Sequence, residues 1–492
     1  RGEATAELTQ KAALRLSQND KVAGELAARD NAGALLNDLR ERRAAASGGQ
    51  AADLDRQIEQ AEAALRQSEV DLQQALPNYH TLVETAVPAA TLFKALRPNE
   101  AVAVTSLSER DGWVFLLRDN RIRLSQIKGG NKRMGELVDA VRKTIEVEGG
   151  GLPAFDAAAA RTLYAETLGG VADGLEGATE LTVVPSGRLL SVPFQMLIAD
   201  AATGPATADT AYLVKKFAIT HVPSAANLVR LREASVKAGD PSSRRWFGFG
   251  ASRPVTLAEG ARLYPSDRCG ESASARDITR LAALPGAAQE LSTVGRLFRA
   301  GPGDEIKGAA FTRKAALARG YADYRVVHFA AHALLAKEVA CQDEPAIVTT
   351  VEGNDAAPQL LTATDILVGM KLNADVVVLS ACNTGGASGK EGGEGLSGLA
   401  RSFFFAGARS LMVTHWPVDD ASSVFLVQAA LNGMRTSASG AIAPALRQAQ
   451  LQMLGTQGYE HPFFWAPLAV IGEGGGRARS ATVAFSTAEA AR

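Results

Sequence analysis

The chain has 492 residues, with 52 Lys or Arg against 53 Asp or Glu, so its formal net charge is −1. This balance excludes a global electrostatic attraction to nucleic acid or anionic lipid, and we expect neither a nucleic-acid partner nor a membrane partner. Hydrophobic residues make up 46% of the chain, yet no apolar run reaches the roughly 20 residues that a membrane-spanning helix needs. The length leaves room for two or three globular domains.

Residues 1–80 are predicted to form a helical hairpin. Good helix formers dominate this region, and SGGQ at 47–50 interrupts them once. One apolar seam runs along the second helix: Leu54, Ile58, Ala61, Leu65 and Leu72. Two interpretations remain open: a hairpin packed on its neighbour, or the last unit of a helical repeat array that binds an activating protein. Since the chain starts at Arg1, we also expect that further residues precede it in the natural protein.

Residues 90–472 are predicted to form an α/β domain, with an N-terminal α/β region at 90–200 and a catalytic half at 240–472. Short apolar runs alternate with helical stretches; they are AVAVTSL, LTVVPSG, FAITHVPS, RWFGFGAS, RVVHFAAHA, DVVVLSACNTGG and RSLMVTHWPVDD. This alternation is typical of a largely parallel sheet flanked by helices, with active groups at the carboxyl ends of strands. Residues 473–492 lack hydrophobic periodicity, which indicates a flexible tail.

Three cysteines occur in the whole chain: Cys269, Cys341 and Cys382. They are too few and too scattered for a disulfide framework, and no CxxC pair indicates a zinc site. We therefore expect a reducing compartment and a cytoplasmic location.

Two of the predicted strands end in reactive side chains, RVVHFAAHA in His332 and DVVVLSACNTGG in Cys382. An imidazole beside a thiol raises its thiolate fraction and can then protonate a leaving amine. A histidine about 50 residues upstream of the cysteine is also the spacing of caspase sequences. Taken alone, Cys382 would be read as a small buried hydrophobe. The glycine-rich loop that follows instead places it where a buried strand meets an exposed loop, as a nucleophile requires.

The other histidines have less support as catalytic groups. His328 lies four residues before His332 on the same strand, so we expect either a hydrogen-bonded core histidine or one that supports the catalytic residues from behind. His415 ends another strand beside Trp416 and is the reserve candidate for the base. The remaining histidines are expected to be structural: His80, His221 and His461.

The loop GGASGKEGGEG contains the dipeptide GK, which invites comparison with a phosphate-binding loop. The pattern G-x-x-x-x-G-K-[ST] fails, because Thr384 and Glu391 stand where glycine and Ser or Thr are required. We therefore expect no nucleotide-dependent signalling domain. The loop is predicted to be a mobile active-site segment that orders with substrate or activator, or is clipped near Lys390.

Several segments in register resemble the CHAT family of caspase-like proteins: LTVVPSGRLLSVPFQML, LPGAAQELSTVGRLF, RVVHFAAHA, DVVVLSACNTGG, GEGLSGLARSFFFAGARSLMVTHWPVDD and HPFFWAPLAVIG. The similarity covers roughly residues 155–472, and the helices before it resemble the region linking such domains to tetratricopeptide repeats. It implies a caspase-like fold and a cysteine endopeptidase with His332 as general base and Cys382 as nucleophile. The implied enzyme needs no metal or organic cofactor. It acts on a protein substrate and is regulated by a partner in a bacterial defence or cell-death system.

The resemblance also implies an oxyanion hole made by the backbone N–H groups of Ala333 and Cys382. Relatives usually have glycine at the position of Ala333. Alanine keeps the N–H but loses the freedom at positive φ. The departure favours an alternative function, a catalytically inactive scaffold or protein-interaction module.

Substrate preference is read from three residues. Ser380, two residues before Cys382, corresponds to the position that caspase-like enzymes use in the pocket for the P1 side chain. Asp419 and Asp420, after THWPV, resemble the separase segment that places a carboxylate in that pocket. Alternatively they cap the following helix, or Asp419 caps it while Asp420 faces the pocket. The sequence thus predicts cleavage after Arg or Lys.

Overall fold

The computed structural model describes much of the chain from residue 49 onward and a few positions before it. The described residues are 28, 31–32, 35–36, 38–39, 42–43, 49–75, 87–145, 147, 151–199, 204–237, 244–265, 269, 273–335, 338–339, 341–342, 344–353, 359–380, 394–416 and 420–475. None of the helices in these ranges combines the length and the apolarity that crossing a bilayer requires.

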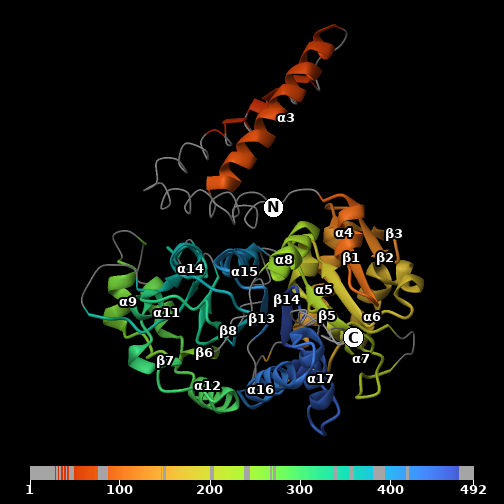
Figure 1. Cartoon of the computed structure of the whole chain (residues 1–492). Coiled ribbons are helices and arrows are strands. Elements are labelled where there is room, and N and C mark those ends of the chain that lie inside the picture. Colours follow the sequence, from red (N-terminus) through yellow and green to blue (C-terminus); the bar gives the residue numbers. More distant parts are fainter. Residues whose placement is uncertain are drawn as a thin grey trace, which may run out of the picture.

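Within the described residues, an 11-stranded sheet organises the fold, in the order β3-β2-β1-β4-β5-β14-β13-β12-β8-β6-β7 (Figure 1). The first six of these strands are β3 (Arg121–Lys128), β2 (Asp111–Arg118), β1 (Glu100–Leu107), β4 (Glu180–Val184), β5 (Ala218–His221) and β14 (Leu468–Gly472). The other five are β13 (Ser410–Thr414), β12 (Val376–Leu379), β8 (Tyr324–Ala330), β6 (Arg244–Gly250) and β7 (Glu305–Lys307).

The sheet consists of two parallel blocks that run in opposite directions. Strands β1, β4, β5 and β14 pair in parallel, and so do β13, β12, β8, β6 and β7. The blocks meet where β13 pairs antiparallel with β14, and β2 and β3 add an antiparallel hairpin at one edge. The expected α/β class with a largely parallel sheet is confirmed. The reversal at β13 and β14 means that only the second block shares its carboxyl edge with β8 and β12.

Helices cover both faces of the sheet (Figure 1). On one face lie α5 (Gly130–Lys143), α6 (Ala157–Thr167), α7 (Leu213–Lys216), α12 (Pro285–Phe298), α16 (Asp420–Thr436), α17 (Ile442–Leu454) and α18 (Pro462–Trp465). On the other face lie α4 (Ala89–Ala95), α8 (Ala225–Lys237), α14 (Ala363–Gly369) and α15 (Glu394–Ala406). Short helical segments complete the domain: η2 (Gly169–Leu175), η3 (Gly187–Ser191), η4 (Phe194–Met196), η5 (Gly308–Ala310) and α13 (Arg313–Leu317).

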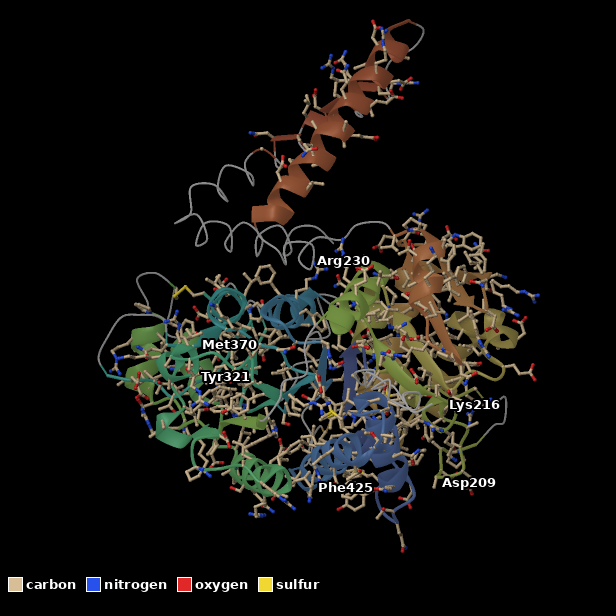
Figure 2. All side chains as sticks on the ribbon, viewed as in Figure 1. Asp209, Lys216, Arg230, Tyr321, Met370 and Phe425 are labelled. Atoms are coloured by element: carbon tan, nitrogen blue, oxygen red, sulfur yellow. A yellow bond between two sulfur atoms is a disulfide. The ribbon has the colours of Figure 1, made fainter. Side chains whose placement is uncertain are left out.

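The two central strands of the second block, β8 and β12, are buried on both faces. Val326 and Val378 belong to the core cluster beneath α12 and α16, whereas Val327 and Val377 belong to the cluster beneath α14 and α15. Side chains of a strand alternate between faces, so a strand covered on both sides must be apolar throughout. The runs VVHFA (326–330) and VVVL (376–379) meet this requirement apart from His328. Figure 2 labels Tyr321 and Met370, which belong to the cluster beneath α14 and α15.

A smaller sheet in the order β11-β10-β9 adjoins the carboxyl end of β8. Its strands are β9 (Ala333–Leu334), β10 (Ala346–Ile347) and β11 (Leu361–Thr362), and the nearby helices are α9 (Leu257–Leu263) and α11 (Ala273–Thr279). Leu334, Val348 and Ile278 are among the buried residues of a separate small core here. This unit carries the chain immediately after His332.

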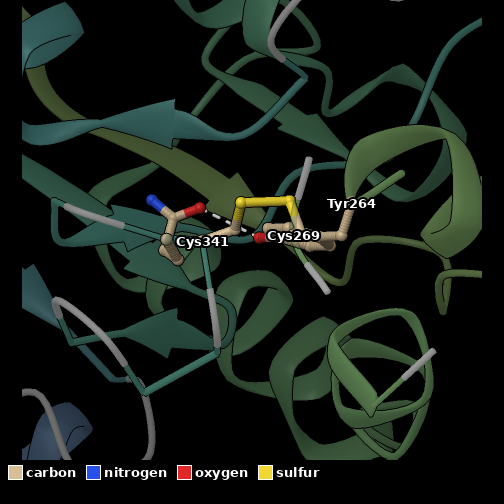
Figure 3. The surroundings of a disulfide bond; sticks show 4 residues. Tyr264, Cys269 and Cys341 are labelled. Atoms are coloured by element: carbon tan, nitrogen blue, oxygen red, sulfur yellow. Dashed lines mark hydrogen bonds between the residues drawn. A yellow bond between two sulfur atoms is a disulfide. The ribbon is translucent and has the colours of Figure 1, made fainter. Parts of the chain in front are cut away.

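A disulfide joins Cys269 to Cys341 across this small core, with Cα atoms 5.3 Å apart (Figure 3). The Tyr264 hydroxyl beside it donates a hydrogen bond to Gln342 Oε1 at 2.9 Å. The sequence analysis argued against a disulfide framework and missed this single bridge. The two cysteines are 72 residues apart, and only the folding of the α9–α11 segment against the β9–β10 connection brings them together.

The helix α3 (Gly49–Ala75) contains the apolar seam predicted for the second helix of the hairpin. Leu54 and Ala61 are buried and cluster with Leu36 and Leu39. Most of the predicted first helix lies outside the described residues, so the hairpin and repeat-array interpretations and the domain boundaries stay predictions. At the other end, Glu473 is buried beside Arg97 and Arg409. Residues 476–492 of the predicted tail lie outside the described residues.

Candidate active site

His332 lies two residues after the end of β8, where the chain passes into the small sheet. Its carbonyl oxygen accepts a hydrogen bond from Val348 N at 2.8 Å. Its half-buried ring places Nε2 2.7 Å from the carbonyl oxygen of Ala282, in the segment between α11 and α12. Backbone and ring are thus both held, one by the small sheet and the other by a loop.

The partner of Nε2 determines the tautomer of the His332 ring. A carbonyl oxygen only accepts hydrogen bonds, so Nε2 must carry the proton. In the neutral ring Nδ1 is then the unprotonated, basic nitrogen. A backbone carbonyl therefore performs here the orienting role that a carboxylate performs in many catalytic histidine sites.

Ala333 is the first residue of β9 and pairs with Ile347 of β10. Because Val348 donates to the carbonyl of His332, the 332/348 pair is hydrogen-bonded and the adjacent 333/347 pair is not. The N–H of Ala333 therefore points away from β10, toward the outer edge of the small sheet. Its backbone is extended, and it is not among the described non-glycine residues with positive φ. Alanine adopts this conformation without strain. The presence of alanine instead of glycine at position 333 is therefore no argument for an inactive scaffold.

Ser380 directly follows β12 and is the last described residue before the glycine-rich loop. Its N–H donates to the carbonyl of Phe329 on β8 at 2.9 Å, and its Oγ lies 3.3 Å from His328 Nε2. Strands β8 and β12 are parallel neighbours, with Leu379 opposite Phe329, so both end at the same edge of the sheet. Cys382, two residues further on, lies outside the described residues.

The other predicted site residues are described in part. Helix α16 starts at Asp420, and the side chain of Asp420 is not described. Asp419 and the loop with Lys390 lie outside the described residues. Their roles in substrate binding and activation stay predictions.

Three of the remaining histidines lie in the interior: His221, His328 and His415. His328 is completely buried, which confirms its prediction as a core residue. His415, the reserve candidate for the base, is only 3% exposed, and burial together with His221 and Arg142 holds its pKa well below the ordinary value. Burial also lowers the pKa of His221 to about 4. His461 caps α18 by accepting from Phe463 N at 3.1 Å, and His80 lies outside the described residues.

One buried carboxylate beside the site was missed from the sequence. Glu290 on α12 is 3% exposed, and its Oε1 lies 2.6 Å from His328 Nε2. The buried residues of α12 are Ala287, Glu290, Leu291, Val294 and Gly295. This i, i+3, i+4, i+7 pattern is an apolar stripe with one charged member. A glutamate at a core position of the stripe was the signal that could have identified it.

Part of the chain is similar to known proteins. The sequence profile of the CHAT domain matches residues 157–473. Tetratricopeptide repeat protein 28 of Mus musculus is 25% identical over 328 residues, which are 60% of this chain and 12% of that protein. The protein of the same name from Homo sapiens is 24% identical over 326 residues, with 60% and 12% covered. The aligned part thus spans a small fraction of either relative.

Two solved structures of the separase–securin complex of Saccharomyces cerevisiae are also similar. One has a TM-score of 0.42 and 9% identity, and covers 84% of this chain and 31% of that chain. The other has a TM-score of 0.39 and 8% identity, with 95% and 40% covered.

Proposed function

The chain belongs to the CHAT domain family, and we propose that it is a cysteine endopeptidase that hydrolyses a protein substrate through His332 and Cys382. The observation that carries the proposal is the hydrogen bond from His332 Nε2 to the Ala282 carbonyl at 2.7 Å. It leaves Nδ1 as a base at the sheet edge where β8 and β12 end together. Cys382 follows three residues after the end of β12, within the reach of a short loop.

The proposed reaction proceeds in two steps. His332 Nδ1 accepts the thiol proton of Cys382, and the sulfur attacks the scissile carbonyl carbon. The same nitrogen then protonates the departing amine, which leaves a thioester. In the second step, water gives a proton to Nδ1 and attacks the thioester, which releases the carboxylic acid and the thiol. The Ala282 carbonyl stabilises the imidazolium that forms in each step through a charge-assisted hydrogen bond.

The developing oxyanion would be held by the N–H groups of Ala333 and Cys382. The outward orientation of the Ala333 N–H supports its share of this role, because that donor is not used in the β9–β10 ladder. The inactive-scaffold alternative predicts instead that no substrate is cleaved at any concentration of enzyme.

We propose cleavage after Arg or Lys. Ser380 is small and neutral and would line the P1 pocket, while Asp420, and Asp419 before it, would supply the negative charge. The start of α16 at Asp420 supports a place for these carboxylates near the same edge, since β13 precedes them in the same parallel block.

The apolar seam of α3 supports the N-terminal helices as the docking site of an activating protein. The relatives named for tetratricopeptide repeats support the repeat-array interpretation of these helices. A role in bacterial defence or cell death and a cytoplasmic location complete the proposal. The Cys269–Cys341 disulfide favours a less reducing compartment, so fractionation of cells decides the location.

A fluorogenic peptide library tests the proposal directly. The chain, with Cys382→Ala as control, is incubated with peptides that vary at P1. We expect release of the fluorophore after Arg or Lys by the unmodified chain and none by the variant. Equal signals from both proteins would contradict the peptidase function. A preference for aspartate at P1 would contradict the proposed cleavage after Arg or Lys.

A further inference from the structure

A polar cluster lies under the edge where β8 and β12 end, and the proposed function uses only one of its members, Ser380. Glu290 Oε1 lies 2.6 Å from His328 Nε2, and the same nitrogen lies 3.3 Å from Ser380 Oγ. Ser423 Oγ donates to Glu290 Oε2 at 3.4 Å. These four residues come from α12, β8, the end of β12 and α16, so the cluster connects four elements at one point.

Burial makes the Glu290–His328 pair costly to maintain. Glu290 is 3% exposed and His328 is 0% exposed. The Trp246 indole and the His328 ring form a T-shaped pair with their centroids 6.2 Å apart. A buried pair of this kind is weak evidence for stability, because apolar residues of similar volume would serve the core as well. Its polar geometry indicates a role in placing its partners.

The direction of the hydrogen bonds is fixed by chemistry. An ionised carboxylate only accepts, so His328 Nε2 carries the proton and shares it between Glu290 Oε1 and Ser380 Oγ. Among the described residues, His328 Nδ1 has no hydrogen-bond partner. Glu290 therefore fixes the His328 ring, and the ring fixes the Ser380 hydroxyl.

Ser380 is consequently held twice by β8. Its N–H donates to Phe329 O at 2.9 Å, and its hydroxyl accepts from His328. Three residues after Phe329 on β8 comes His332, and two residues after Ser380 comes Cys382. The proposed base thus lies two residues beyond the end of β8, and β8 itself holds Ser380, two residues before the proposed nucleophile.

We propose that Glu290 and His328 are positioning residues that set the reactivity of Cys382 through Ser380. The inference rests on the proposed dyad. It adds Glu290 and His328, which neither react nor touch the substrate. Displacing a reacting atom by about 1 Å can cost on the order of 100-fold in rate. Loss of the Glu290 contact lets the Ser380 hydroxyl turn and loosens Ser380, two residues before the proposed nucleophile.

A double-mutant cycle tests this coupling. The variants are Glu290→Gln, which keeps the shape, Ser380→Ala, and the double variant. The readouts are kcat with a fluorogenic peptide and the rate of alkylation of Cys382 by iodoacetamide, located by peptide mass spectrometry. Alkylation is run without reductant, because Cys269 and Cys341 are then protected in the disulfide. We expect each single variant to slow both rates by about 10-fold, and the double variant to be no slower than the slower single one.

A second cycle provides the control. Asp375 is a buried carboxylate at the opposite end of β12, paired with Arg325 and 3% exposed. Asp375→Asn disturbs the same strand without touching the cluster, so its effect should add to that of Ser380→Ala. Additive effects of Glu290→Gln and Ser380→Ala, or a Glu290→Gln variant with a lower Tm and unchanged rates, would overturn the inference. Failure of every protein to cleave peptide contradicts the proposed function alone, because alkylation still reports the coupling.

Discussion

The Nε2–H of His332 donates to the carbonyl oxygen of Ala282 at 2.7 Å, across 50 residues of sequence. This contact joins the chain just after β8 to the segment between α11 and α12, and it leaves Nδ1 of the ring unprotonated, as the proposed base. The orientation of the proposed base is therefore set by a main-chain atom, which no side-chain substitution removes.

The loop that holds the base can still be loosened. The side chain of Ala282 is exposed, so Ala282→Gly removes no packing and increases only the freedom of the backbone. Such a change is worth about 0.5–1 kcal/mol, which corresponds to a fall in kcat of about 2- to 5-fold with little change in KM. Ala283→Gly is the matched control, since its side chain is also exposed, and it should leave kcat nearly unchanged. Equal effects of the two variants would contradict an orienting role for the Ala282 carbonyl.

Ala333→Pro removes one proposed oxyanion donor while sparing the sheet. The N–H of Ala333 points away from β10, and β9 is an edge strand, the setting in which a strand tolerates proline. We expect kcat to fall by about 100-fold or more with a folded protein, measured by peptide hydrolysis and circular dichroism. Ala333→Gly keeps the N–H and should retain most of the activity. Full activity of the Ala333→Pro variant would mean that the Ala333 N–H does not hold the oxyanion.

The Cys269–Cys341 disulfide is predicted to stabilise the segment that carries Ala282. It closes a loop of 72 residues, for which the loss of unfolded-state entropy amounts to about 4 kcal/mol at most. Cys269→Ser should therefore lower the free energy of unfolding by a few kcal/mol, measured by urea denaturation without reductant. Cys382→Ser serves as control and should change stability little. Equal stability of all three proteins would show that these cysteines do not pair in solution.

Stability should fall in mild acid because of His221. Burial lowers its pKa in the folded protein to about 4, against about 6.5 in the unfolded chain. Between these values the unfolded state binds the extra proton, so stability is fully present above pH 6.5 and declines as the pH falls toward 4. The loss is about 2 kcal/mol at pH 5, and His415 adds to it because its pKa is lowered in the same direction. Urea denaturation at pH 7.5 and 5 should show a smaller difference for His221→Gln; an unchanged difference would contradict this assignment.

The parts of the fold that follow local rules were predictable from sequence. The valine-rich runs around His328 and Val377 read as buried strands because both faces of the sheet are covered, and the structure places them as neighbouring parallel strands. The seam of α3 followed from helical periodicity. His332 could be assigned to a strand end because its strand pattern stops just before it.

The missed features depend on contacts between distant segments. The antiparallel junction of β13 and β14 has no local signature, since a strand's apolar pattern is the same in either direction. Cys269 and Cys341 meet only after the small core forms, and the Ala282 carbonyl carries no information in its side chain. Glu290 was recognisable as a charge within an apolar stripe, but its partner His328 lies on another element.

Labelling with an electrophilic peptide tests the His332–Cys382 dyad most directly. A peptidyl acyloxymethyl ketone with Arg at P1 is incubated with the chain and with His332→Ala, and the intact masses and modified peptides are measured. The account predicts one adduct per chain, located at Cys382, whose formation slows by orders of magnitude in His332→Ala. No adduct at Cys382, or equal labelling rates in the two proteins, would contradict it.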